Sequence, residues 1–137
     1  MGKIAFLFSG QGAQYSGMGR ELAKLSPAAA MLFALADKIR PSTSAQCFSG
    51  SQEELAETKN TQPCLFCVDL AAALALEEAG VQADGATGFS PGGMGALAFA
   101  GILGRGSGFL LVCRRAGCRG GAGRPGKQRP AGGPTPH

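Results

Sequence analysis

Residues 81–101 carry the sequence VQADGATGFSPGGMGALAFAG, and this stretch decides the fold. Its first part, Val81–Phe89, contains a short strand. Ser90 falls at the turn that follows, and Pro91 begins an apolar helix that Gly101 stops. A strand that turns directly into a helix is the building unit of layered sheet proteins. The stretch therefore predicts the α/β class.

The turn has the pattern G-x-S-x-G, with Gly88 and Gly92 on either side of Ser90. A serine at a sharp strand-to-helix turn projects its hydroxyl away from the sheet, where it can act as a nucleophile. The residues two before and two after it must be small, because larger side chains would collide across the turn. The alternative interpretation is a glycine-rich turn whose serine only caps a helix.

The N-terminal segment predicts a second strand. Lys3–Phe8 is almost wholly apolar, which is typical of a strand buried on both faces, and the tight loop Gly10–Gln14 follows it. Pro41–Ser51 is expected to be a connection. Three further helices are predicted at Met18–Leu25, at Ala28–Ile39 with Pro27 in its first turn, and at Phe109–Arg115. A brief helix follows the capping box Ser51–Glu54 and runs through Glu57. A longer helix is capped by Thr61, has Pro63 in its first turn and is ended by Gly80.

The charge of the chain is concentrated at its end. Residues 1–115 carry nine Lys and Arg against nine Asp and Glu, so the whole net charge of +4 lies beyond them. Residues 116–137 form a Gly/Arg/Pro-rich tail that we expect to be disordered. A reading-frame change after codon 115 is one hypothesis for its composition, and translation of the other two frames tests it. The basic tail gives no sign of a nucleic-acid partner.

Five cysteines and no export signal argue against a disulfide framework, so we expect a cytoplasmic protein. Cys64 and Cys67 have a redox or zinc spacing. No second cysteine pair lies at metal spacing, and His137 is the only histidine, so we expect buried structural thiols on a helix and no metal. The longest apolar run is too short for a membrane span.

Several ordered motifs across residues 3–115 resemble the acyl-CoA:acyl-carrier-protein transacylases, and also the acyltransferase domains of polyketide synthases. The matching segments are Gly10–Gln14 (G-Q-G-x-Q), Thr61–Pro63 (T-Q-P), Gly88–Gly92 (the nucleophile turn, usually G-H-S-x-G), Ala98–Leu103 and Arg115. The resemblance implies an incomplete α/β-hydrolase-like three-layer core, residues 1–115, from which the family's ferredoxin-like subdomain is missing.

The resemblance also implies an [acyl-carrier-protein] S-malonyltransferase of fatty-acid biosynthesis. Ser90 would accept a malonyl group from malonyl-CoA and pass it to the phosphopantetheine thiol of acyl carrier protein. The N–H of Gln11 and the position of Pro91 would form the oxyanion hole, Arg115 would hold the malonyl carboxylate, and Gln62 would support the site. Coenzyme A thioester is the substrate, and no bound cofactor is implied.

The sequence departs from the family pattern at the site itself. Phe89 stands where the family has His, and Gly93 stands where it has Glu. Pro91 has no N–H to donate. The general-base histidine would come from a later segment, and His137 lies in the tail. We therefore expect this chain to be impaired or inactive, and an inactive remnant with no catalytic role is the alternative function.

Two other enzyme classes fit less well. A serine hydrolase with the same turn needs an acid after Ser90, and none follows it. A dinucleotide-binding unit matches G-x-G-x-x-A at residues 93–98, but the acid expected about twenty residues later is absent.

Overall fold

The computed structural model describes residues 2–89 and 92–122. Within these ranges the chain forms two strands and seven helices. In chain order they are β1 (Ala5–Phe8), α1 (Arg20–Leu25), α2 (Pro27–Ile39), α3 (Thr43–Ser49), α4 (Gln52–Ala56), α5 (Thr58–Glu78), β2 (Gly85–Gly88), α6 (Gly92–Phe99) and α7 (Arg105–Ala122). The strands β1 and β2 pair in parallel. This mixture of helices with a parallel sheet confirms the predicted α/β class.

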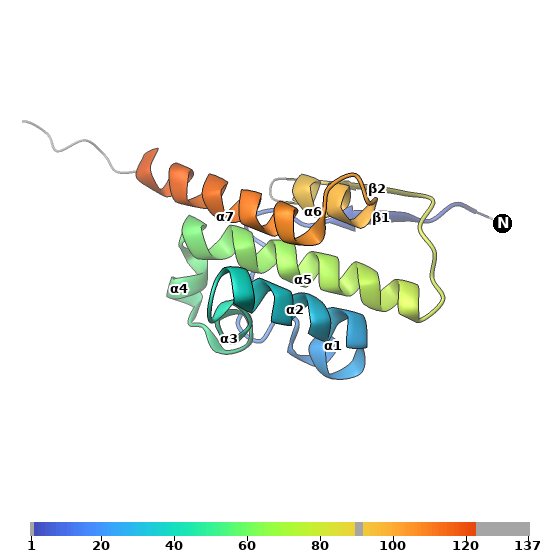
Figure 1. Cartoon of the computed structure of the whole chain (residues 1–137), viewed down its shortest axis with the longest axis horizontal. Coiled ribbons are helices and arrows are strands. Elements are labelled where there is room, and N and C mark those ends of the chain that lie inside the picture. The colour runs from blue at the N-terminus through green and yellow to red at the C-terminus, as the bar shows by residue number, and fades with distance from the viewer. Residues whose placement is uncertain (1, 90–91, 123–137) are drawn as a thin grey trace, which may run out of the picture.

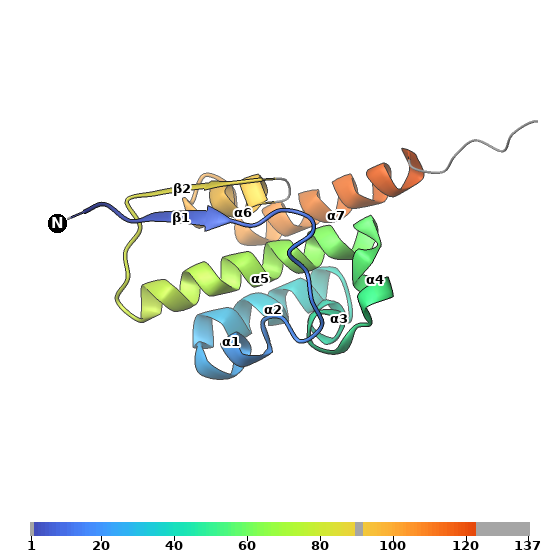
Figure 2. The same cartoon turned by 180° about the vertical axis from the view of Figure 1, so that it is seen from behind.

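The long helix α5 runs through the middle of the molecule, with the sheet and α6 on one side and α1, α2 and α3 on the other (Figures 1 and 2). The main core forms where α5 meets α2 and α7, around buried Phe66, Phe33 and Phe109. A smaller core joins the sheet to α5 and α6 through Phe6 and Phe8. Burial of these large apolar side chains is the main stabilising contribution.

The structure corrects the prediction that the first strand is buried on both faces. Along β1 the side chains alternate between exposed and buried. Phe6 and Phe8 point into the smaller core, whereas Leu7 is 78% exposed. Within the described residues only one face of the two-stranded sheet carries helices, so only every second side chain is covered.

The helix ends that the sequence predicted from caps and stops are largely confirmed. The Ser51 hydroxyl caps α4, as predicted, by accepting from the Glu54 N–H at 3.1 Å. The Ser26 hydroxyl, which the sequence analysis did not single out, caps α2 by accepting from the Ala29 N–H at 3.1 Å. Gly80 follows α5 with φ +92°, and Gly101 follows α6 with φ +79°. Both glycines adopt the left-handed conformation that ends helices.

The segment predicted as a connection contains helix α3 instead. Its first turn is held by a side chain from the preceding helix, because the Asp37 carboxylate accepts from the Ser44 N–H at 2.9 Å. Its inner face is fixed by Cys47, which is fully buried against the main core. Both contacts are tertiary, so local propensity did not indicate this helix.

The predicted start of α5 at Thr61 is wrong, since the helix begins at Thr58 and Thr61 lies inside it with Pro63. The Thr61 hydroxyl is buried and donates to the carbonyls of Leu55 and Glu57. It therefore bonds backwards to α4 and the α4–α5 junction rather than capping N–H groups ahead of it.

Helix α7 is longer than the predicted Phe109–Arg115, because it begins at Arg105 and its backbone continues to Ala122. Helical structure therefore extends past residue 116, where the sequence analysis placed the start of a disordered tail. Gly117 leaves open space around its Cα, and Ala116 is fully buried. The rest of the tail, residues 123–137, lies outside the described residues.

Candidate functional site

The carboxyl ends of β1 and β2 lie side by side, because the strands are parallel and Phe8 is paired with Gly88. The Phe89 N–H donates to the Phe8 carbonyl at 3.4 Å, which continues the pairing beyond β2. The loop after β1 and the turn after β2 therefore leave the sheet at the same edge. In open α/β sheets this is the edge at which ligands bind.

The two glycines of the G-x-S-x-G pattern are required by close backbone contacts. A Cβ on Gly92 would lie 2.5 Å from the Phe8 carbonyl oxygen and 2.6 Å from that of Ser9. A Cβ on Gly88 would lie 2.5 Å from the Gly92 carbonyl carbon. Both positions therefore exclude any side chain, as the sequence analysis predicted. The tightness of the turn also holds α6 against the end of β1.

The loop Gly10–Gln14 is held by its own side chains and by α5. The Gln14 side-chain oxygen accepts from the Gly12 N–H at 2.7 Å, and Gly12 has φ +113°, which favours glycine. The Gln11 side chain donates to the Thr58 hydroxyl at 3.3 Å. These contacts fix the loop beside the first turn of α5.

The predicted site residues fall into two groups. Ser90 and Pro91 lie outside the described residues. Gln11 is exposed on the loop after β1, whereas Gln62 is buried, one helical turn after the Thr58 that Gln11 contacts. Arg115 is half-buried in the second half of α7.

Both views show that the carboxyl ends of the strands, the first turn of α5 and the second half of α7 lie toward the same end of the molecule (Figures 1 and 2). The elements that carry Gln11, Gln62 and Arg115 are therefore brought to one end. The structure gives no contact between Arg115 and the other two residues.

A shallow cavity of about 280 Å³ opens at the strand ends. Leu7, Ser9, Thr87 and Phe89 are among its lining residues. Phe89 is 82% exposed. An apolar side chain is thus presented to solvent directly before the candidate nucleophile in the sequence.

One polar pair beneath the loop was missed by sequence reasoning. The Ser9 hydroxyl donates to the Asp69 carboxylate, with both oxygens at 2.8 Å. Burial raises the pKa of Asp69 to about 6, although the hydrogen bonds from the Ser9 hydroxyl and backbone act in the opposite direction. The available signal was that Asp69 is the only charged residue in the apolar stretch 61–76.

Two other kinds of feature are absent from the described part of the chain. Across residues 2–89 and 92–122, no three His, Cys, Asp or Glu side chains come together as a set that could hold a metal ion. Nor does any helix in these ranges combine the length and apolar character that a bilayer span requires. Cys64 and Cys67 do lie buried on a helix, as predicted.

A parallel strand pair whose second strand is followed by a helix, with Gly88 and Gly92 in close backbone contact, defines an α/β protein. Comparison with known proteins identifies the family: residues 5–130 match the acyl transferase domain. The chain belongs to this family. The match continues past Arg115, so the sequence analysis placed the end of the resemblance too early.

The chain is similar to proteins that carry this domain alone or within larger synthases. It is 44% identical over 104 residues to the malonyl CoA-acyl carrier protein transacylase of Bacillus subtilis, covering 75% of this chain and 33% of that protein. It is 39% identical over 116 residues to polyketide synthase GfsB of Streptomyces halstedii, covering 82% of this chain and 2% of that protein.

Solved structures agree with these sequence matches. The Synechocystis malonyl-CoA:ACP transacylase superposes with a TM-score of 0.80 at 36% identity, covering 88% of this chain and 41% of that chain. The chain therefore spans about a third of the length of the curated Bacillus subtilis transacylase, and less than half of the solved Synechocystis one.

Proposed function

We propose that this chain carries the nucleophile-bearing part of an [acyl-carrier-protein] S-malonyltransferase. The substrate is malonyl-CoA, a coenzyme A thioester, the acceptor is the phosphopantetheine thiol of acyl carrier protein, and no bound cofactor takes part. The observation that carries the proposal is the crowding of Gly88 and Gly92 against Phe8 and Ser9. This crowding supports a turn at Ser90 that lies beside the loop that bears Gln11.

The proposed reaction has two balanced steps. In the first, the Ser90 hydroxyl attacks the thioester carbonyl, its proton passes to a general base, the carbon–sulfur bond breaks, and coenzyme A leaves as the thiol. In the second, the carrier thiol attacks the acyl-serine ester, the carbon–oxygen bond breaks, and Ser90 regains its proton. Malonyl transfer therefore leaves the protein unchanged.

The other residues have defined tasks in this scheme. The backbone N–H of Gln11 stabilises the oxyanion that forms in each step, and Pro91 offers no second donor. Arg115 pairs with the malonyl carboxylate, for which a planar two-pronged cation is well suited. Buried Gln62 fixes the polar surroundings from α5. The remaining strands of a hydrolase-like core, the ferredoxin-like subdomain and the base histidine belong to the family's later sequence.

A hybrid enzyme tests this proposal. Residues 5–115 replace the matching segment of the Bacillus subtilis relative, which supplies the rest of the domain. With radiolabelled malonyl-CoA we expect protein-bound label that survives denaturation and is lost in Ser90→Ala. Pro91→Leu restores the second N–H and should speed acylation by about 10²–10³. A hybrid that folds but takes no label at Ser90 would refute the proposal.

The same labelling experiment on the chain by itself tests the alternative, that the chain is an inactive remnant. Because His137 is its only histidine and lies in the basic tail, we expect no label above that of Ser90→Ala and no rescue by Pro91→Leu. Label on the unaltered chain would show that Ser90 reacts without the family's base.

A second candidate, a polyketide synthase-type acyltransferase, rests on the similarity to GfsB. Competition between malonyl-CoA and methylmalonyl-CoA in the hybrid compares the two acyl choices.

A further inference from the structure

Two buried thiols from different helices meet beneath α3. Cys47 lies on α3 and Cys64 on α5, and both are 0% exposed. The Cys47 thiol donates to the Cys64 carbonyl oxygen at 3.9 Å, so the Cys47 side chain lies directly against Cys64. Seventeen residues separate them in the chain, so only the packing of α3 on α5 brings them together.

A surface cavity lies next to this thiol pair and is separated from Cys64 by the Gln46 side chain. It has a volume of about 230 Å³, and Arg40, Gln46, Gly50 and Glu54 are among its lining residues. The Gln46 side chain is the link to the interior, because its oxygen accepts from the Cys64 thiol at 3.4 Å and its nitrogen donates to Glu54 at 2.8 Å. A small molecule that displaces the Gln46 amide reaches the Cys64 sulfur.

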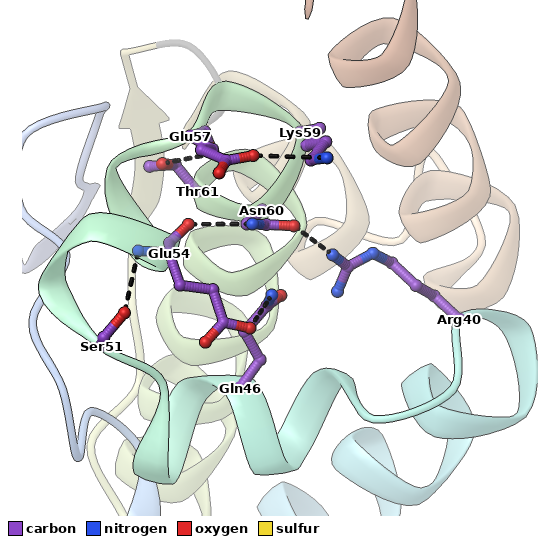
Figure 3. Close-up of polar contacts among 8 residues, drawn as sticks. All are labelled: Arg40, Gln46, Ser51, Glu54, Glu57, Lys59, Asn60 and Thr61. Atoms are coloured by element: carbon purple, nitrogen blue, oxygen red, sulfur yellow. Dashed lines mark hydrogen bonds and ion pairs between the residues drawn. The ribbon is translucent and has the colours of Figure 1, made fainter.

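Figure 3 shows how the walls of this cavity are held. Arg40 donates to the Asn60 side-chain oxygen at 2.8 Å, and Asn60 donates to the Glu54 carbonyl at 2.9 Å. The guanidinium is thereby kept against the first turn of α5. The helices above the two thiols are short: α3 and α4 lie at the edge of the molecule and pack on one side of α5.

The electrostatics make the two thiols unequal. The hydrogen bond from Cys47, and then the Arg40 guanidinium, lower the pKa of Cys64 against the effect of its burial. The same hydrogen bond and burial raise the pKa of Cys47. Burial raises the pKa of Cys67 well above its ordinary value. Cys64 is thus the one of these three thiols whose pKa is lowered, and the thiolate is the reactive form of a cysteine.

We propose that Cys64 and Cys47 form a peroxide-reactive dithiol, a modification site separate from the acyl-transfer site. The Cys64 thiolate attacks one oxygen of a small hydroperoxide, the O–O bond breaks, and hydroxide or alkoxide leaves and is protonated. Cys64 becomes a sulfenic acid. The Cys47 sulfur then attacks the Cys64 sulfur, the S–O bond breaks and water leaves. The product is a disulfide that ties α3 to α5, and a thiol reductant reverses it.

Peptide mapping of the whole chain tests this site. After treatment with hydrogen peroxide and alkylation of the remaining thiols, we expect a loss of two hydrogens in mass and a linked peptide pair that contains Cys47 and Cys64. Dithiothreitol should restore the original mass. A link between Cys64 and Cys67, or oxidation without any link, would overturn the proposal.

Variants assign the order of the two steps. Cys64→Ala should slow thiol oxidation at least about tenfold, because it removes the activated thiolate. Cys47→Ala should leave the first step and trap Cys64 as the sulfenic acid, which dimedone labels. Cys113→Ala, at a half-buried thiol on α7, is the matched control and should form the same link as the unaltered chain. Equal oxidation rates in Cys64→Ala and the control would refute the assignment, and circular dichroism checks that each variant folds.

Discussion

The Ser9 hydroxyl lies 2.8 Å from both carboxylate oxygens of Asp69, which follows it by 60 residues in the chain. This pair ties the segment after β1 to the middle of α5, directly below the loop that carries Gln11. The carboxyl group is largely withdrawn from water, and its burial raises the pKa to about 6 from an ordinary 3.8. The folded state therefore holds this proton more tightly than the unfolded chain does.

The raised pKa gives a prediction for the pH dependence of stability. Between pH 3.8 and about 6 the folded state binds more protons than the unfolded chain, so this group's stabilising contribution is complete below pH 3.8 and is lost as the pH rises through 6. Asp69→Asn should remove that loss and increase stability at pH 7. Urea unfolding from pH 4 to pH 7 measures it, with Asp84→Asn, an exposed carboxylate, as the control. Equal pH dependence in the unaltered chain and Asp69→Asn would contradict the assignment.

The glycine contacts at the turn predict a position-specific loss of stability. Gly88→Ala places a methyl group 2.5 Å from the Gly92 backbone, and we expect destabilisation of about 1–3 kcal/mol from overpacking. Gly85→Ala is the matched control in the same strand, because nothing lies within 4 Å of its added Cβ and the change should be within about 0.5 kcal/mol. Denaturant midpoints compare them. Similar losses at both positions would mean that strand propensity, rather than the turn contact, decides the effect.

We expect the buried amide of Asn60 to contribute more to the free energy of unfolding than the ion pair beside it. Asn60 bonds both the Glu54 carbonyl and the Arg40 guanidinium (Figure 3), so Asn60→Ala leaves two groups unpaired and should cost about 1–3 kcal/mol. Lys59 pairs with Glu57 at 3.3 Å with both side chains largely exposed, so Lys59→Ala should cost less than about 0.5 kcal/mol. Thermal unfolding measures both variants. The reverse order would contradict the bonding described for the α4–α5 junction.

Neighbouring arginines on α7 give the sharpest test of substrate recognition. In the hybrid enzyme, Arg115→Ala should reduce kcat/KM for malonyl-CoA by about 10- to 100-fold, the effect of losing a charged hydrogen bond. Acetyl-CoA, which has no carboxylate, should be affected much less. Arg114→Ala is the control, because Arg114 is exposed whereas Arg115 is half-buried. Equal losses for the two acyl groups would exclude a role of Arg115 in binding the carboxylate.

Features that depend on neighbouring residues were predictable from the chain alone. The cap Ser51 and the stops Gly80 and Gly101 act within one or two helical turns, so the residue types alone are enough to place them. The strand–turn–helix unit around Gly88 and Gly92 was also predicted, together with the reason that both must be glycine. The roles of Ser90 and Pro91 remain predictions.

Features that depend on distant residues were not predictable. Helix α3 forms because Asp37 and the main core hold it, and α5 starts at Thr58 because Thr61 bonds back toward α4. The Ser9–Asp69 pair and the Cys47–Cys64 pair each join separate elements. The sequence thus determined the family and the two crowded glycines Gly88 and Gly92, whose patterns are local. Only the tertiary structure decided which buried polar groups and thiols meet, because burial removes water as a partner and leaves the fold to supply another.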